Sequence, residues 1–155
     1  MKIVPARILS ITVAFLLCAL AARSGAGPLE EVYKLPVWVD AVTEVCPWKS
    51  SAAEGYIRLI RQEHSDGSHG LFVQWIRKGI AGQPTQAVST LAVEQLESEY
   101  LVRLEMPESM LARDACRLKA RAEDMVNERR YEFDLLLHGP GEMQVNITRM
   151  LGGGV

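Results

Sequence analysis

The stretch over residues 54–78 constrains the fold of this chain more than any other. Two runs rich in β-branched and aromatic residues flank the sequence Ser65-Asp66-Gly67-Ser68, and Asp-Gly is among the strongest short hairpin signals. A two-residue turn at Asp66 and Gly67 would set apolar residues against apolar residues and a guanidinium against an indole. The facing pairs in this register are Ser65 with Ser68, His64 with His69, Ile60 with Val73, Arg58 with Trp75, and Ile57 with Ile76. The sequence therefore predicts an antiparallel hairpin.

Other segments alternate with the period of two that half-buried strands show. Residues 35–46 form a first predicted strand, which Pro47 ends, and residues 99–106 form another, which Pro107 ends. A crossing loop with a helical turn is expected over 107–114. A last hairpin is predicted over 131–147, around the turn Gly139-Pro140-Gly141. About seven or eight short strands predict an all-β, immunoglobulin-like antiparallel β-sandwich.

For residues 115–130, the amino-acid composition and the hydrophobic pattern predict different secondary structures. Their composition favours a helix, but apolar and charged residues alternate strictly over 116–123. On a helix the charges of this segment would surround the whole circumference. We therefore predict a strand over 115–123 and a polar turn or short helix over 124–130. Residues 86–95 fit a strand or a helix equally, so the alternative fold is α+β with a helical pair in residues 87–130.

The beginning of the chain has the layout of a secretory signal peptide. Lys2 and Arg7 precede an apolar run over 8–20, and small residues follow it. The apolar run is shorter than the roughly 20 residues of a comfortable membrane span, although an uncleaved anchor is the alternative. We expect a signal peptide over 1–26, a single β-sandwich domain over 27–151, a flexible tail over 152–155, and a periplasmic or secreted protein.

Cleavage would change both the charge and the cysteine count. Removal of residues 1–26 takes away three basic residues and no acidic one, so the formal net charge moves from −2 to −5. This balance argues against nucleic acid, and against the membrane after signal cleavage, as partners. Cys18 would leave with the signal peptide, so the remaining pair, Cys46 and Cys116, is predicted to form a disulfide in an oxidising compartment. Two separate buried thiols are the alternative.

The segment around the predicted turn contains the main candidate for binding chemistry. If His64 and His69 face each other, their Cβ atoms lie about 5 Å apart and the two imidazoles could share copper or zinc. Glu63 or Asp66 would assist as a further ligand. Hydrolytic and cofactor-binding signatures such as GxSxG, HExxH and a phosphate-binding glycine loop are missing. We expect neither a cofactor nor an enzyme, and an enzyme of unknown class is one alternative.

A group of strand and turn residues in this part of the chain resembles a known family. They are Gly70-Leu71-Phe72, Arg77-Lys78-Gly79, Gly82, Thr85-Gln86, Ser89 and Leu91. Over residues 54–123 the chain resembles the small periplasmic curli-assembly inhibitors and chaperones of the CsgH type. This resemblance implies an exported, disulfide-bearing, immunoglobulin-like sandwich, but it transfers no binding residue.

These observations together predict a non-catalytic, exported binding module. An open sandwich has edge strands whose unpaired backbone groups accept another strand. The expected partner is a protein or peptide, such as an aggregation-prone or fibre-forming subunit. A periplasmic metal-binding protein that uses His64 and His69 is the other alternative function.

Overall fold

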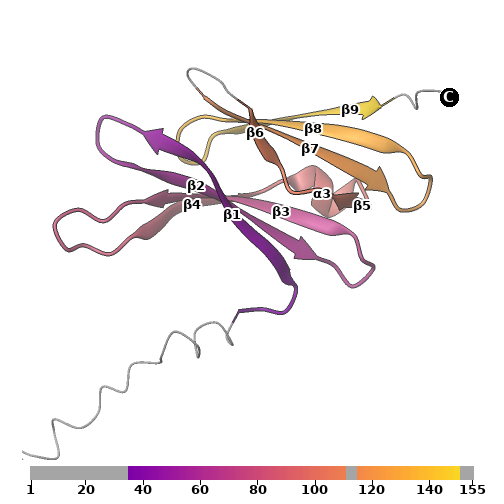
Figure 1. The fold of residues 1–155 in the computed structure, drawn as a ribbon, viewed down its shortest axis with the longest axis horizontal. Helices are drawn as coiled ribbons and strands as arrows, with labels where there is room; N and C mark the ends of the chain where they lie inside the picture. The colour runs from indigo at the N-terminus through magenta and orange to yellow at the C-terminus, as the bar shows by residue number, and fades with distance from the viewer. Residues whose placement is uncertain (1–34, 111–114, 151–155) are drawn as a thin grey trace, which may run out of the picture. The chain divides into compact units, whose positions relative to one another are not determined.

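The computed structural model describes residues 35–110 and 115–150, which contain nine strands and one short helix (Figure 1). The predicted signal peptide over 1–26 and the predicted tail over 152–155 lie outside the described residues. The all-β prediction is confirmed. The helical pair considered for 87–130 is wrong, because the described part of that segment holds four strands and a single five-residue helix, α3 (Glu94–Ser98).

Two antiparallel sheets form the layers of a sandwich (Figure 1). Sheet A contains four strands in chain order, namely β1 (Val39–Lys49), β2 (Glu54–Glu63), β3 (His69–Arg77) and β4 (Gln86–Ala92). In sheet B, two short strands pair with one side of β7 (Cys116–Asp124), and β8 (Arg130–Leu137) and β9 (Met143–Met150) follow on its other side. The two short strands are β5 (Val102–Leu104) and β6 (Glu108–Met110).

The likeness to immunoglobulin domains is one of architecture. The strands of sheet A are neighbours in sequence order, whereas immunoglobulin domains use Greek-key connections. The predicted disulfide is present and joins the two sheets, from Cys46 in β1 to Cys116 in β7, with a Cα–Cα distance of 6.0 Å. The two sheets therefore share one core and are also linked covalently.

The core confirms the alternation that the sequence shows. Ile57, Leu59, Val73 and Trp75 of sheet A are almost fully buried, and they belong to the same apolar cluster as Phe133 of sheet B. In β7 the four alternate residues from Cys116 to Ala122 are buried. Their intervening charged neighbours lie on the outer face, so the strand pattern prevailed over the helical composition of this segment.

The hairpin between β2 and β3 is present, but its predicted register is wrong by one residue. Glu63 faces His69 and Ile57 faces Trp75. The loop has three residues, because His64 N–H donates to Ser68 O at 2.8 Å and Gly67 N–H donates to His64 O at 2.9 Å. Gly67 has a φ of +82°, which is the left-handed conformation that such three-residue hairpins require. The additional loop residue displaces every facing pair.

Three other boundaries differ from the sequence predictions. Pro47 does not end β1; it lies within this strand, opposite Tyr56, and an edge strand tolerates proline. Residues 108–110 form β6 instead of a helical turn, and residues 111–114 are outside the described part. The ambiguous segment over 86–95 divides into the end strand β4 and the start of α3.

Candidate functional site

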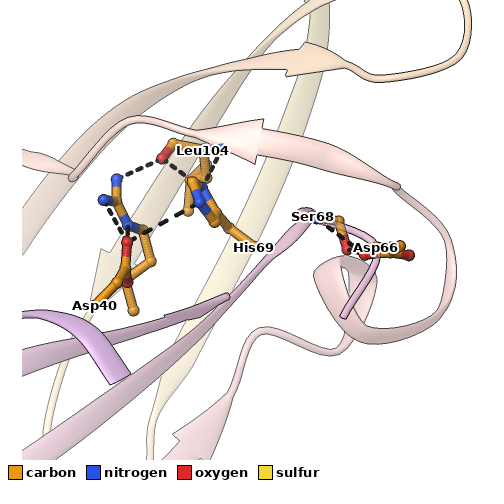
Figure 2. A network of polar contacts seen from close by, with 6 residues as sticks. Asp40, Asp66, Ser68, His69 and Leu104 are labelled. Carbon is orange, nitrogen blue, oxygen red and sulfur yellow. Dashed lines mark hydrogen bonds and ion pairs between the residues drawn. The ribbon is translucent and has the colours of Figure 1, made fainter. Parts of the chain in front are cut away.

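One polar cluster joins the two sheets and is called the bridging cluster; it consists of Asp40, Arg61, His69 and Leu104 (Figure 2 labels Asp40, His69 and Leu104). Arg61 in β2 binds Asp40 in β1 through Nε and Nη2, at 2.9 and 2.7 Å from Oδ2, and its Nη1 donates to Leu104 O at 2.7 Å. Leu104 N–H donates to His69 Nδ1 at 2.9 Å. Side chains of sheet A thus bind the end of β5, a strand of only three residues.

The ion pair between Arg61 and Asp40 gives this cluster a role in holding the sheets together. Burial by itself raises the pKa of the Asp40 carboxyl, but the hydrogen bond from Arg61 and its charge outweigh burial and hold that pKa below the ordinary 3.8. His69 Nε2 lies 4.0 Å from Asp40 Oδ2. Because the guanidinium binds both the Asp40 carboxylate and the Leu104 carbonyl, the cluster stabilises the contact between the sheets.

A second polar cluster lies at the tip of the β2–β3 hairpin and is called the tip cluster, comprising Gln62, His64, Asp66, Ser68 and Glu97. Ser68 Oγ lies 3.1 Å from His64 Nδ1, and His64 Nε2 lies 3.6 Å from Glu97 Oε2. This order of serine, histidine and carboxylate is that of a hydrolytic triad. Sequence reasoning missed it, because Glu97 comes from α3 and no local motif links it to the hairpin.

Ser68 of the tip cluster is held within the turn and is closed to solvent. Gln62 Nε2 lies 2.9 Å from His64 Nε2, and His64 Nδ1 lies 3.1 Å from Ser68 Oγ. The Ser68 hydroxyl in turn donates to Asp66 Oδ1 at 2.6 Å. Ser68 is fully buried, so its hydroxyl is closed to solvent (Figure 2 shows Ser68 and Asp66 at the turn).

The tip cluster instead stabilises the turn. Asp66 Oδ1 accepts the hydroxyl of Ser68 and also its backbone N–H at 2.9 Å, and these two hydrogen bonds lower the pKa of the Asp66 carboxyl. Gly70 lies beneath the cluster, and a Cβ there would meet Glu97 Oε1 at 2.3 Å. The glycine at this position therefore leaves room for the Glu97 carboxylate beside His64.

The two histidines proposed as metal ligands do not face each other. His69 faces Glu63 and belongs to the bridging cluster, whereas His64 lies in the tip cluster, opposite Ser68 across the loop. The alternation of a strand places the two imidazoles on opposite faces. No group of three His, Cys, Asp or Glu side chains gathers to hold a metal ion in residues 35–110 and 115–150. Metal binding by this pair stays a prediction, without the facing geometry from which it was made.

The edge strands differ in how well they are protected against pairing with another chain. β1 has two register irregularities and contains Pro47, and β5 and β6 have three residues each. β9 carries Arg149. The outermost strand of sheet A, β4, has the sequence QAVSTLA, which contains neither a charge nor a proline. Bulges, prolines and charges are the usual protection of edges. β4 lacks prolines and charges, and its pairing with β3 has one register shift, between Ser89 and Ala87.

Two rows of side chains cross the outer face of sheet A and end on β4. The apolar row consists of Val42, Ile60, Phe72 and Ala92, which face one another in register across all four strands. The polar row runs through hydrogen bonds. Arg58 Nε donates to Gln74 Oε1 at 2.6 Å, and Gln74 Nε2 donates to Thr90 Oγ1 at 2.9 Å. The β4 edge therefore presents both rows to whatever lies beside it.

A cavity of about 520 Å³ opens between β1 and β6, beside the disulfide. Its apolar lining includes Trp48, Ile57, Met110 and Leu137, and His138 is at its margin. Ala115 also lines it. Lys49 and Ser109 are further polar side chains in this lining.

Comparisons with protein families, with curated proteins and with solved structures found no match to this chain. No helix among the described residues is long and apolar enough to cross a membrane. The class that the fold defines is an all-β, disulfide-linked sandwich, and the disulfide is compatible with an oxidising extracellular or periplasmic compartment.

Proposed function

We propose that this protein is an exported, non-catalytic binding module that holds an extended segment of another polypeptide beside β4. The observation that carries this proposal is the β4 edge itself. It is seven residues long and uncharged, and it pairs only with β3 among the described strands. Its outer row of backbone N–H and C=O groups provides affinity for a guest strand irrespective of the sequence of the guest.

The side chains of β4 define which guest would fit best. Ala92 ends the apolar row with a small residue, so a large apolar side chain of the guest can cover it and contact Phe72. Thr90 Oγ1 accepts a hydrogen bond from Gln74, which leaves its own hydroxyl hydrogen to donate outward. Both rows lie on one face of the sheet, so the preferred guest carries an apolar residue and a hydrogen-bonding polar residue two positions apart.

The cellular setting follows from independent features. The signal-peptide pattern over 1–26 and the Cys46–Cys116 disulfide support a periplasmic or secreted location. The resemblance to curli-assembly inhibitors of the CsgH type supports a fibre-forming subunit as the guest. A guest held by its backbone cannot pair with further copies of itself on that side, so the module would slow the growth of fibres.

The test adds the purified protein to a fibre-forming subunit from the same host, at substoichiometric and equimolar ratios. We expect slower fibre growth and a crosslinked complex. The variant Thr90→Lys places a charge on the outer face of β4 and should abolish both effects. The matched control is Thr148→Lys, which places the same charge on the edge strand β9 and should retain them.

Each other outcome has a defined meaning. Unaltered fibre growth at both ratios, together with no crosslinked complex, would refute the proposed function. Loss of activity in Thr148→Lys but not in Thr90→Lys would place the guest at β9 and refute the assignment to β4. Sedimentation of the protein alone checks whether β4 pairs with a second copy, in which case Thr90→Lys would convert a dimer into a monomer.

A further inference from the structure

Two ion pairs on the outer face of sheet B form a regular diagonal series. Arg117 in β7 binds Asp134 in β8, with Nε 2.9 Å from Oδ1, and Lys119 Nζ lies 2.6 Å from Glu132 Oε1. In the register of these strands Asp134 faces Lys119 and Glu132 faces Arg121. Arg117 therefore binds the acid that faces Lys119, and Lys119 binds the acid that faces Arg121.

This series breaks at Arg121. The residue at the next diagonal position is Arg130, which faces Glu123. Glu132, directly opposite Arg121, already binds Lys119. Within the described ranges neither Arg121 nor Arg130 forms an ion pair. Two guanidinium groups thus occupy diagonal neighbouring positions, where the pattern of the sheet would place a cation and an acid.

A cavity of about 560 Å³ lies at this break in the series. Arg121 and Arg130 line it together with Arg103 of β5 and Arg61, of which Arg61 is already bound to Asp40. The remaining lining consists of Leu104, Glu105, Ala122, Glu123 and Met150. Three guanidinium groups outside the bridging cluster therefore face two carboxylates, so the wall carries an excess of positive charge within a chain that is acidic as a whole.

We propose that this cavity is a binding site for an oxyanion, a carboxylate or phosphate group, held between Arg121 and Arg130 with Arg103 at its margin. A guanidinium presents two parallel N–H donors that match the oxygens of such a group. The ligand occupies the place of the acid that the series lacks, and it relieves the repulsion between two neighbouring cations. Glu105 and Glu123 limit the site to a compact anion, because they repel an extended polyanion such as nucleic acid.

The test measures binding by calorimetry at low salt, with inorganic phosphate, succinate and a short peptide that carries a single glutamate as separate probes. We expect at least one probe to bind, and Arg121→Gln or Arg130→Gln to weaken it by at least tenfold. The matched control is Arg117→Gln, on the same face of β7 but in a complete ion pair, which should change the affinity by less than twofold. Binding of phosphate or succinate identifies a free anion as the source, and binding of the peptide alone identifies an acidic side chain of a partner.

The variant Arg130→Glu separates this site from a general effect of charge or of misfolding. It places an acid diagonal to Arg121 but directly opposite Glu123, so it should abolish binding, and a cooperative thermal unfolding transition shows that the variant is folded. Failure of all three probes to bind would overturn the proposal. Equal losses of affinity in Arg117→Gln and Arg121→Gln would also overturn it, since they would indicate attraction to the whole face. The proposed anion ligands Arg103, Arg121 and Arg130 are on sheet B and not on β4, so these outcomes are independent of a guest at β4.

Discussion

Gly55 allows the closest backbone approach in sheet A, and its replacement by alanine provides a sharp test of the packing. Gly55 lies in β2 and faces Trp48 in β1. A Cβ at this position would lie 1.8 Å from the carbonyl oxygen of Ile76 and 2.9 Å from Trp48 Nε1. These two atoms are themselves joined, because Trp48 Nε1–H donates to Ile76 O at 3.1 Å in a buried hydrogen bond.

The cost of this substitution follows from what must move. The carbonyl oxygen belongs to the backbone of β3, so a methyl group fits only if β2 and β3 separate locally. Overpacking of this kind costs about 1–3 kcal/mol, and a buried indole N–H that loses its acceptor costs about 1–3 kcal/mol more. We expect Gly55→Ala to lower the free energy of unfolding by about 2–6 kcal/mol, a large part of the 5–15 kcal/mol that is typical of a domain.

Urea unfolding followed by tryptophan fluorescence measures this change. The matched control is Gly139→Ala, since a Cβ at Gly139 would meet only the Glu142 side chain, at 3.9 Å, which is an ordinary contact. The control should lie within about 0.5 kcal/mol of the wild type. If the two variants had the same midpoint, the close approach between Gly55 and β3 would be refuted.

Two further predictions concern the links between the sheets. Replacing Cys46 by serine opens a disulfide with a sequence separation of 70, so chain entropy predicts a loss of roughly 4 kcal/mol in urea unfolding; a wild type that is insensitive to reductant would contradict this. Asp40→Asn should cost about 1–3 kcal/mol at pH 7, because it removes a charged hydrogen-bond acceptor from Arg61. Since the pKa of Asp40 is lower in the folded protein than its ordinary value of 3.8, its stabilisation is complete above about pH 4 and is lost as the pH falls through the folded pKa. The difference between wild type and variant should therefore shrink at pH 2, and an equal difference at pH 7 and pH 2 would contradict the ion pair.

The sequence predicted the features that depend on local periodicity. The alternation over 116–123 was sufficient to predict β7 against a helical composition, and the structure buries each alternate residue from Cys116 onward. The last hairpin, over β8 and β9, was predicted from the same pattern and its glycine-rich turn. The Cys46–Cys116 bond followed from counting the cysteines that remain after the predicted cleavage.

Features that depend on neighbours in space could not be predicted. The loop of the first hairpin took three residues, not two, and this single difference separated His64 from His69. The tip cluster needs Glu97 from α3, and nothing in the local sequence indicates where that helix packs. The break in the ion-pair series at Arg130 is visible only when β7 and β8 are placed in register.

The edge strands show why local features could be predicted from the sequence and features that depend on spatial neighbours could not. Whether a strand has one buried face is encoded in its own residues, because alternate side chains point to opposite sides of a sheet. Whether that strand is internal or outermost depends on which other strands pair with it, and those strands come from distant parts of the chain. The sequence alone therefore shows that β4 contains no charged residue. Only the tertiary structure made it an edge, since β3 covers one side of this strand and no other described strand pairs with its opposite side.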